Sequence, residues 1–356
     1  MAAIVFTGGG TAGHCTPCTA LFPYVRKYFD EIYYIGSEKG IERGIIERTG
    51  IPYYFVPCAK LIRSATFKNL AIPFKVAAGT KEAVKLLKKL RPDVVFSKGG
   101  YVAVPVVFAA HKLGIPVISH ESDYTPGLAN KLTARLCAKS LTSFPETAKM
   151  LKNGLYTGSP IRKELFEQDK RAAVKRFGFS GNNPVLLITG GSQGAQAINA
   201  AFAAAKKDLL PRFEIIHIAG KGNTVTAKEN SPAGKEKGIF TAEFLPDMEN
   251  ALAAADVCVS RAGSNTVFEL MSLKIPCVLI PLPKGNSRGD QVLNAGYFQR
   301  LGHALVLPQQ ELTGESLTFC INCAYANRFN IKRNFEERPV KSACETIANV
   351  IAGYRR

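Results

Sequence analysis

Polar residues that could bind an anionic ligand follow a predicted buried strand in the stretch 254–295 of this 356-residue chain. The apolar run at 257–259 stops at the sequence SRAGSN, and an amphipathic helical pattern that starts at about Thr266 carries Glu269 on its first turn. Free backbone N–H groups at a helix start favour a negative ligand, and the glycine at 263 lets the backbone approach it closely. The stretch therefore predicts a site for a negatively charged ligand.

A second loop of the same kind follows directly. Pro276 ends the predicted helix, residues 277–282 are typical of a buried strand, and the polar loop 284–290 leads into a helix that carries Gln291 and Asn294. Successive strand-to-helix loops of an open parallel sheet lie at one edge, where such sheets bind ligands. We therefore expect the two loops to open on the same edge of the sheet.

The role of Glu269 has two interpretations, and its position in the sequence does not decide between them. Thr266 and Glu269 match a capping box, in which the carboxylate only satisfies the helix start. Alternatively, the Glu269 carboxylate contacts the ligand.

The elements that position these residues repeat along the chain. A buried strand at 2–7 is followed by a glycine loop at 8–13, and the strand at 184–189 is followed by a second glycine loop at 190–195. A lone GxGxxG pattern is a weak signal, because any tight strand-to-helix turn needs glycine. Strands that alternate with helical stretches predict an α/β fold of two tandem Rossmann-like domains. The expected strands are 2–7, 32–36, 52–56, 93–97, 116–120, 184–189, 213–220, 239–245, 257–260, 277–282 and 303–308.

Turn residues that cluster at 157–160 predict the domain boundary. We expect an N-terminal domain at 1–160 and a C-terminal domain at 161–339. A last helix is predicted from about Val340 to Tyr354.

His14 ends the first glycine loop and is a candidate general base, because a neutral imidazole can accept a proton near neutral pH. Alternatively, His14 only donates to a backbone carbonyl or orients a phosphate. Asp123, in the sequence HESD at 120–123, is a rival base.

The formal charge of +18 predicts a polyanionic partner or surface. No apolar run approaches the ~18 residues of a membrane span, and the N-terminus lacks the charged start of a signal peptide. The nine cysteines are interpreted as reduced thiols. The pairs Cys15/Cys18 and Cys320/Cys323 lack a second pair or two histidines at zinc-finger spacing, so no metal site is predicted.

A lysine stripe adds a possible membrane contact. Residues 61–76 mix large apolar side chains with cations, and one face of the following predicted helix carries Lys81, Lys85, Lys88 and Lys89. Such a stripe is often only a solvated face. At an anionic membrane each basic residue contributes about 1 kcal/mol of binding.

Six blocks of the chain resemble, in the same order, the MurG family of bacterial N-acetylglucosaminyltransferases. They are FTGGGTAGHCTP at 6–17, FSKGGYVAVP at 96–105, HESDYTPGLANK at 120–131, TGSPIR at 157–162, GGSQGAQAIN at 190–199 and the stretch 254–295.

The resemblance implies a GT-B glycosyltransferase fold with an interdomain cleft and no metal or cofactor. The implied reaction is inverting transfer of N-acetylglucosamine from UDP-GlcNAc to the muramic acid 4-hydroxyl of lipid I (undecaprenyl-pyrophosphoryl-MurNAc-pentapeptide), which gives lipid II. The N-terminal domain would bind the acceptor and an anionic membrane surface, braced by the last helix at about 340–356. The C-terminal domain would bind the UDP-sugar. The family acts peripherally at the cytoplasmic face of the bacterial cell membrane.

The same resemblance implies roles for individual residues. Glu269 would hold the ribose hydroxyls, Gln291 would contact the donor sugar, and the backbone of Leu245 would read the uracil. Asp123 stands where many family members carry the asparagine that meets the donor sugar. The remaining donor contacts implied are Ser192 and Arg162 near the phosphates, and Arg261, Ser264 and Asn265 in the nucleotide site. Thr11, Ala12 and Gly13 would lie near both the donor sugar and the acceptor diphosphate. The acceptor diphosphate would also contact Gly9, Gly10 and the loop 98–101, with Gly99, Gly100 and Tyr101.

Two other classes of function compete. A nicotinamide-dependent oxidoreductase would use Gly8, Gly10 and Gly13 with Glu38 as the ribose acid, but this does not explain the second glycine loop. A nucleic-acid-binding protein is suggested by the charge alone, without a recognisable binding motif. We expect no nucleic-acid partner.

Overall fold

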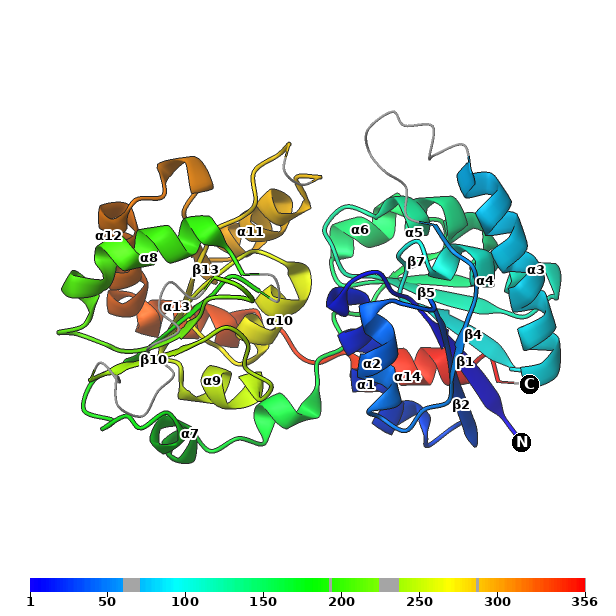
Figure 1. Ribbon diagram of the computed structural model, residues 1–356, viewed down its shortest axis with the longest axis horizontal. Helices are drawn as coiled ribbons and strands as arrows, with labels where there is room; N and C mark the ends of the chain where they lie inside the picture. The colour runs from blue at the N-terminus through cyan, green and yellow to red at the C-terminus, as the bar shows by residue number, and fades with distance from the viewer. Residues whose placement is uncertain (60–70, 192–193, 224–236, 286–287, 356) are drawn as a thin grey trace. The chain divides into compact units, whose positions relative to one another are not determined.

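The structure of this chain is a computed structural model that describes residues 1–59, 71–191, 194–223, 237–285 and 288–355 (Figure 1). It divides into two compact units. Unit 1 contains Met1–Arg162 and Ser342–Arg356, and unit 2 contains Lys163–Lys341.

The described part of unit 1 has a seven-stranded parallel sheet in the order β3-β2-β1-β4-β5-β6-β7. Side chains alternate between its faces, so that Ile4 and Phe6 of β1 enter one apolar core and Val5 enters another. Both faces are therefore apolar and must be covered. The strands are β1 (Ala3–Thr7), β2 (Glu31–Gly36), β3 (Tyr53–Phe55), β4 (Val94–Ser97), β5 (Val117–Glu121), β6 (Lys139–Thr142) and β7 (Gly154–Tyr156).

Helices supply this cover. α1 (Ala12–Val25) and α14 (Cys344–Ala352) pack against each other in the core that holds Ile4 and Phe6. α3 (Ile72–Leu90) and α4 (Ala103–Lys112) cover the face of Val5. The other helices of unit 1 are α2 (Ile41–Glu47), α5 (Leu128–Thr133), α6 (Pro145–Met150) and the 3-10 turn η2 (Ala134–Leu136).

The described part of unit 2 has a six-stranded parallel sheet in the order β10-β9-β8-β11-β12-β13. Its strands are β8 (Val185–Thr189), β9 (Glu214–Ile218), β10 (Ile239–Ala242), β11 (Val257–Ser260), β12 (Cys277–Leu279) and β13 (Ala304–Val306). Its helices are α7 (Lys170–Arg176), α8 (Gln196–Leu209), α9 (Met248–Ala254), α10 (Ser264–Ser272), α11 (Asp290–Arg300), α12 (Gly314–Ala326) and α13 (Arg328–Glu337), with 3-10 turns η3 (Lys163–Phe166) and η4 (Gln309–Glu311).

The predicted fold class of two Rossmann-like α/β domains is confirmed. β6 and β7 were not predicted, because both are short and β7 has three exposed residues. The predicted start of the last helix at Val340 is wrong. Ala343 N–H instead donates to Ser159 O (2.9 Å), and Ser342 Oγ donates to Ile161 O (2.9 Å). These bonds hold residues 342–343 against 159–161, so the helix begins only at Cys344.

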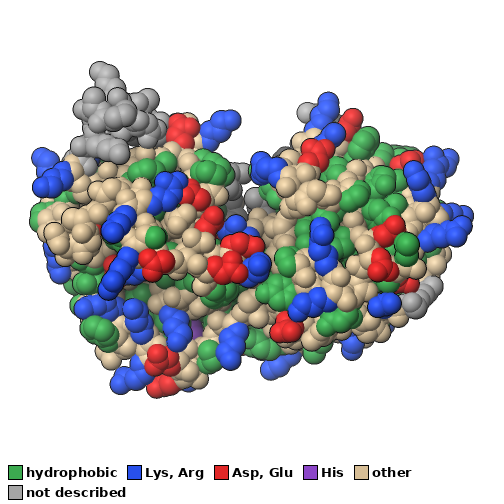
Figure 2. Space-filling view, turned by 90° about the horizontal axis from the view of Figure 1, so that it is seen from below, with side chains coloured by type: hydrophobic (Ala, Val, Ile, Leu, Met, Phe, Trp, Pro, Cys, Tyr) green, Lys and Arg blue, Asp and Glu red, His purple; other side chains and the backbone are tan. Residues whose placement is uncertain are grey.

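Positive charge is concentrated in unit 1. This unit contains 24 Lys and Arg against 11 Asp and Glu, which is +13 of the total +18. Figure 2 shows cationic side chains spread over the visible face rather than gathered at one point. Within the described residues, no helix is long and apolar enough to cross a membrane.

Candidate active site

In unit 1 the first glycine loop lies at the switch point of the sheet. The chain runs from β1 to β2 and β3 on one side and then returns to β4 on the other side of β1. The adjacent ends of β1 and β4 are in register at Thr7 and Ser97. The loops 8–11 and 98–102 therefore open side by side, in the position where open α/β sheets bind ligands.

The two loops are in direct contact and need glycine. A Cβ at Gly10, whose φ is +90°, would lie 2.5 Å from Tyr101 Cε1. A Cβ at Gly100, whose φ is +81°, would collide with the Gly9 carbonyl oxygen. The structure thus brings together Gly9, Gly10, Gly99, Gly100 and Tyr101, which were predicted as one diphosphate site.

Glu42 fixes the first loop and was missed by the sequence analysis. Its carboxylate is fully buried and accepts from Gly10 N–H (3.2 Å), Ser37 N–H (3.1 Å) and the Ser37 hydroxyl. The sequence feature that could have indicated this role is a glutamate in the first turn of a helix that follows a strand. At that position an acidic side chain is usually solvated. A buried carboxylate with these donors holds the loop in one conformation.

His14 is the third residue of α1, and Ala12 is the first, directly after Thr11 and next to Gly13. The His14 Nδ1 atom lies 3.2 Å from the Lys98 carbonyl oxygen. A carbonyl oxygen can only accept, so Nδ1 carries the proton of the neutral ring. The Nε2 atom is then the unprotonated nitrogen, which is the form that a general base needs.

The loop after β5 contains the rival base. Glu121 accepts from Asp123 N–H (3.0 Å), Gly127 N–H (2.8 Å) and Asn130 Nδ2 (2.8 Å), and so fixes the turn around Asp123. His120 is fully buried, and its Nε2 atom pairs with Gly158 O at 3.0 Å. Burial lowers the pKa of His120 well below its usual value, so this ring stays neutral.

Lys98 does not serve the diphosphate with its side chain. That side chain is 1% exposed, and Nζ donates to the Ser122 hydroxyl inside unit 1. The interpretation of 98–101 as a diphosphate loop is therefore limited to its main chain and Tyr101.

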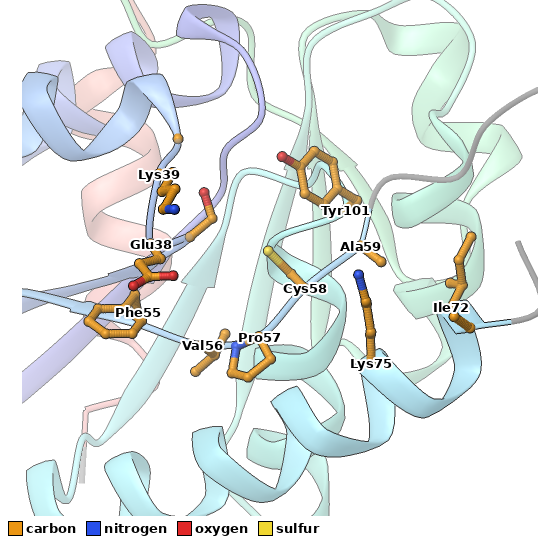
Figure 3. Close-up of a pocket in the computed structure, with 13 residues that line it drawn as sticks. Glu38, Lys39, Phe55, Val56, Pro57, Cys58, Ala59, Ile72, Lys75 and Tyr101 are labelled. Atoms are coloured by element: carbon orange, nitrogen blue, oxygen red, sulfur yellow. The ribbon is translucent and has the colours of Figure 1, made fainter. Parts of the chain in front are cut away.

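A cavity of about 700 Å³ lies in unit 1 between Tyr101 and the residues that follow β2 and β3 (Figure 3). Its lining includes Glu38, Lys39, Phe55, Lys75 and Tyr101. Figure 3 shows Lys75 extending from α3 into this space on the side of Tyr101. The cavity combines two cations, Lys39 and Lys75, and one carboxylate, Glu38, with apolar walls.

Unit 2 has its own switch point, between β8 and β11. Thr189 and Ser260 are in register at the ends of these strands. The second glycine loop and the loop at 261–263 therefore open next to each other. Ser192, predicted at the start of the helix after this glycine loop, lies outside the described residues, and the helix itself, α8, begins only at Gln196.

α10 begins at Ser264 with Gly263 as its N-cap, two residues before the predicted start. Thr266 is therefore not the cap residue, and the capping-box interpretation of Glu269 is wrong. Glu269 lies half-buried in the second turn of the helix, and Asn265 is half-buried in its first turn. Ser264 itself is buried at the helix start.

Arg261 and Asn294 hold this loop from inside. Arg261 is 8% exposed and its Nη1 donates to Ile280 O (3.1 Å), which joins the loops after β11 and β12. Burial lowers the pKa of Arg261. Asn294 is fully buried, and its Nδ2 donates to Ala262 O (3.1 Å). Asn294 is thus a loop-supporting residue whose role its sequence position did not reveal.

Gln291 lies on the first turn of α11, the helix whose Asn294 contacts Ala262 in the loop after β11. Its Oε1 accepts from Leu282 N–H (3.0 Å), which leaves the amide NH₂ group as the donor end of the side chain. Leu245, whose backbone was predicted to read the uracil, is buried. Arg162 is half-buried and ends the first segment of unit 1.

The nine cysteines, all of which the structure describes, form no disulfide. Cys15 and Cys18 are buried in α1, and burial raises the pKa of Cys18 to about 12. The pKa of Cys15 is raised as well, for the same main reason. Both thiols therefore remain protonated, which is the unreactive form.

Comparison with known families places this geometry in an enzyme class. Residues 4–142 match the glycosyltransferase family 28 N-terminal domain, and residues 185–347 match the glycosyltransferase family 28 C-terminal domain. The calicheamicin glycosyltransferase CalG4 shares the fold, with a TM-score of 0.70, 13% identity, and 99% and 98% of the two chains covered. The fold is that of a GT-B glycosyltransferase.

Closer relatives carry a specific name. Two of them are called UDP-N-acetylglucosamine--N-acetylmuramyl-(pentapeptide) pyrophosphoryl-undecaprenol N-acetylglucosamine transferase. The protein of Clostridium botulinum (strain Hall) is 46% identical to this chain over 100% of both chains. The protein of Clostridium tetani is 43% identical over 99% of this chain and 98% of the relative. The crystal structure of Acinetobacter baumannii MurG matches with a TM-score of 0.76 and 25% identity over 99% of this chain and 100% of that chain. The chain belongs to this transferase family, within glycosyltransferase family 28, and is a hexosyltransferase. The comparisons support neither the oxidoreductase nor the nucleic-acid-binding alternative.

Proposed function

We propose that the chain transfers N-acetylglucosamine from UDP-GlcNAc to the 4-hydroxyl of the muramic acid unit of lipid I, a step of peptidoglycan biosynthesis. The observation that carries this proposal is identity of 43–46% over essentially the full length to transferases named for that reaction. The two switch-point sites support it, because the reaction needs one site for a nucleotide-sugar and one for a diphosphate-linked acceptor.

Unit 2 is proposed to hold the donor. Glu269 accepts from the ribose hydroxyls, and the Gln291 amide donates to the sugar. The N–H groups at the start of α10 bind the diphosphate. Arg162, predicted near the donor phosphates, belongs to unit 1. Arg261 supports this site from inside, because its guanidinium donates a hydrogen bond to the Ile280 carbonyl oxygen.

Unit 1 is proposed to hold the acceptor. The loops 8–11 and 98–101 bind its diphosphate through main-chain N–H groups other than those of Gly10, Lys98 and Gly99, which already donate to Glu42, Thr7 and Ser97. The cavity that Lys39 and Lys75 line together with Glu38 takes further parts of this substrate. His14 Nε2 takes the proton of the 4-hydroxyl as its oxygen bonds to the donor C1. The C1–O bond to UDP breaks, and its electron pair leaves with the diphosphate.

Incubation with labelled UDP-GlcNAc and a short-chain lipid I analogue tests the reaction. The expected product is the lipid-linked disaccharide, with release of UDP. Consumption of UDP-GlcNAc without a disaccharide, or no reaction while the same assay works with an authentic relative, would contradict the proposal.

Transfer should not depend on a divalent metal and should invert the anomeric centre. The physical reason is that helix N–H groups and cations can carry the leaving-group charge, and that attack from the face opposite UDP gives a β-1,4 linkage. Rates with and without excess EDTA should agree, and proton NMR of the product should show a β-anomer. Loss of activity in EDTA that magnesium or manganese restores would contradict the first part, and an α-anomer the second.

Peripheral binding to the cytoplasmic face of the cell membrane is proposed for unit 1. Lys81, Lys85, Lys88 and Lys89 are all exposed on α3, while Ala83 and Leu87 of the same helix are buried. Part of the predicted contact, residues 60–70, lies outside the described residues. The stripe of lysines continues toward Phe74 in the first turn of α3, which is 78% exposed. Unit 1 also carries most of the positive charge.

We propose that α5 adds apolar side chains to this membrane contact, which the sequence analysis did not include. Leu128 and Leu132 are 52% and 59% exposed, one helical turn apart. α5 packs against α4, and α4 packs against α3. Exposed leucines beside cations fit a surface that inserts shallowly into an anionic bilayer.

Replacing Lys81, Lys85, Lys88 and Lys89 by Gln should weaken binding to anionic liposomes at least about 10-fold, because each cation contributes about 1 kcal/mol before screening. Activity on a water-soluble acceptor should stay nearly unchanged. The matched control replaces four exposed lysines of unit 2, Lys175, Lys207, Lys332 and Lys341, and should bind as the native chain does. Equal binding by both variants in a sedimentation assay would show that the stripe is only a solvated face.

A further inference from the structure

The cavity of unit 1 has a lining that fits only some parts of a lipid-linked substrate. Its charged groups leave one positive charge in excess, because Lys39 and Lys75 stand against Glu38. Most of the remaining lining is apolar and includes Phe55, Val56, Pro57, Ala59 and Ile72. A ligand that fits this cavity therefore combines a negative group with an apolar one.

The loops proposed to bind the acceptor diphosphate lack a cation of their own. Lys98 is the one basic residue of the loops 8–11 and 98–101. Its side chain is buried, and its Nζ donates to the Ser122 hydroxyl. The negative charge of a diphosphate at these loops thus favours a cation from another part of unit 1.

Tyr101 connects these loops to the cavity. Its ring packs so closely on the first loop that a Cβ at Gly10 would lie 2.5 Å from Cε1, and the same ring lines the cavity. Lys75 is exposed and extends from α3 into the cavity on the side of Tyr101 (Figure 3). Among the described residues Lys75 forms no ion pair, so its ammonium can bind a phosphate that lies beside Tyr101.

The first turn of α3 joins the cavity to the proposed membrane contact. Ile72 and Lys75 are three positions apart, which places them on one face of the helix, and both line the cavity. Phe74 lies between them in the chain and is 78% exposed. A lipid chain that leaves the membrane at α3 therefore meets the cavity at this turn.

The apolar wall suits a lipid better than a peptide. A buried peptide needs partners for its main-chain N–H and C=O groups. The wall offers few of them, because Val56 N–H already donates to Gly36 O (3.1 Å) and Pro57 has no N–H. A hydrocarbon chain needs no such partner.

We propose that this cavity holds the lipid end of the acceptor. Lys75 pairs with the phosphate that is bonded to the polyprenyl chain, and the wall that contains Ile72 takes the first isoprene units. The inference rests on the proposed transferase reaction, and it names the part of the acceptor that the cavity selects.

Calorimetric titration of the full chain with geranyl diphosphate, a short soluble prenyl diphosphate, and with inorganic pyrophosphate tests this assignment. The native chain should bind geranyl diphosphate at least about 10-fold more tightly, because its isoprene carbons leave water. Lys75→Gln should weaken binding of both probes about 10-fold, since both lose the cation. Ile72→Ser should weaken binding of geranyl diphosphate alone, and its native affinity for pyrophosphate would show that it is folded. Lys112→Gln, at the exposed end of α4, is the matched control and should bind both probes as the native chain does.

Equal affinities of the native chain for the two probes, or native affinities in Lys75→Gln, would overturn the assignment. Muramyl-pentapeptide 1-phosphate, which has the peptide but no lipid, tests the other occupant. If Ile72→Ser weakens its binding and leaves geranyl diphosphate unaffected, the cavity holds the peptide and the lipid assignment is wrong. A chain that shows the expected pattern but makes no disaccharide would support the cavity assignment and count against the reaction. A chain that makes the disaccharide without this pattern would count against the lipid subsite alone.

Discussion

Replacing His14 by Ala is expected to lower kcat about 10²- to 10⁴-fold, the usual contribution of a general base. The reason is the bond between Nδ1 and the Lys98 carbonyl, which leaves Nε2 as the basic nitrogen. The KM for UDP-GlcNAc should change little, because the proposed donor contacts lie in unit 2. Steady-state kinetics with the lipid I analogue measures both constants.

His14→Gln separates a base from a residue that only orients a phosphate. Gln can still donate to the Lys98 carbonyl, but it cannot take a proton. The native rate should fall at acidic pH as the imidazole becomes protonated, and this limb should be absent in the Gln variant. His111→Gln is the matched control, because His111 is exposed on α4, and its rate should be native. A Gln variant with native kcat would contradict the assignment of His14 as the base.

Replacing Glu269 by Ala is expected to lower donor kcat/KM about 10- to 150-fold, which corresponds to loss of a charged hydrogen-bonding interaction of about 1.5 to 3 kcal/mol. The stability of the protein should not fall with it. Glu269 lies in the second turn of α10, beyond the N–H groups that a cap would satisfy, and Ala is a better helix former than Glu.

A donor with 2′-deoxyribose shows whether the loss concerns the ribose. The native enzyme should discriminate strongly against this donor, because the Glu269 carboxylate loses a partner. The Ala variant should treat both donors almost alike, and Glu269→Gln should fall between the two. Equal discrimination by native and Ala proteins would remove Glu269 from the nucleotide site.

The sequence was sufficient for features that depend on local pattern. The buried strands are β-branched runs that stop at glycine, so β1, β8 and β11 could be placed within about a residue. The lysine stripe on α3 follows directly from helical periodicity, since Lys81 and Lys85 are exposed and Ala83 is buried.

The residues that were missed act through contacts distant in the chain. Glu42 supports Gly10 across 32 positions, and Asn294 supports Ala262 across the same separation. No local pattern distinguishes such a side chain from a solvated one, because the order of the strands in the sheet decides which distant residue it contacts. The same holds for Lys98, which looked like part of a phosphate loop until its burial became visible. The error at Thr266 arose because a match to a capping box does not say where the helix begins.

The way α14 completes unit 1 has a consequence for biosynthesis. Ile347 and Ile351 are fully buried in the same core as Ile4 and Phe6, although more than 340 positions separate them from β1. A chain that leaves the ribosome from its N-terminus exposes this side of the first sheet until α14 has been made. Unit 2 is one continuous segment and can close earlier. The unit that is translated first is therefore the unit that finishes folding last, and a stop codon ahead of α14 would damage unit 1 rather than unit 2.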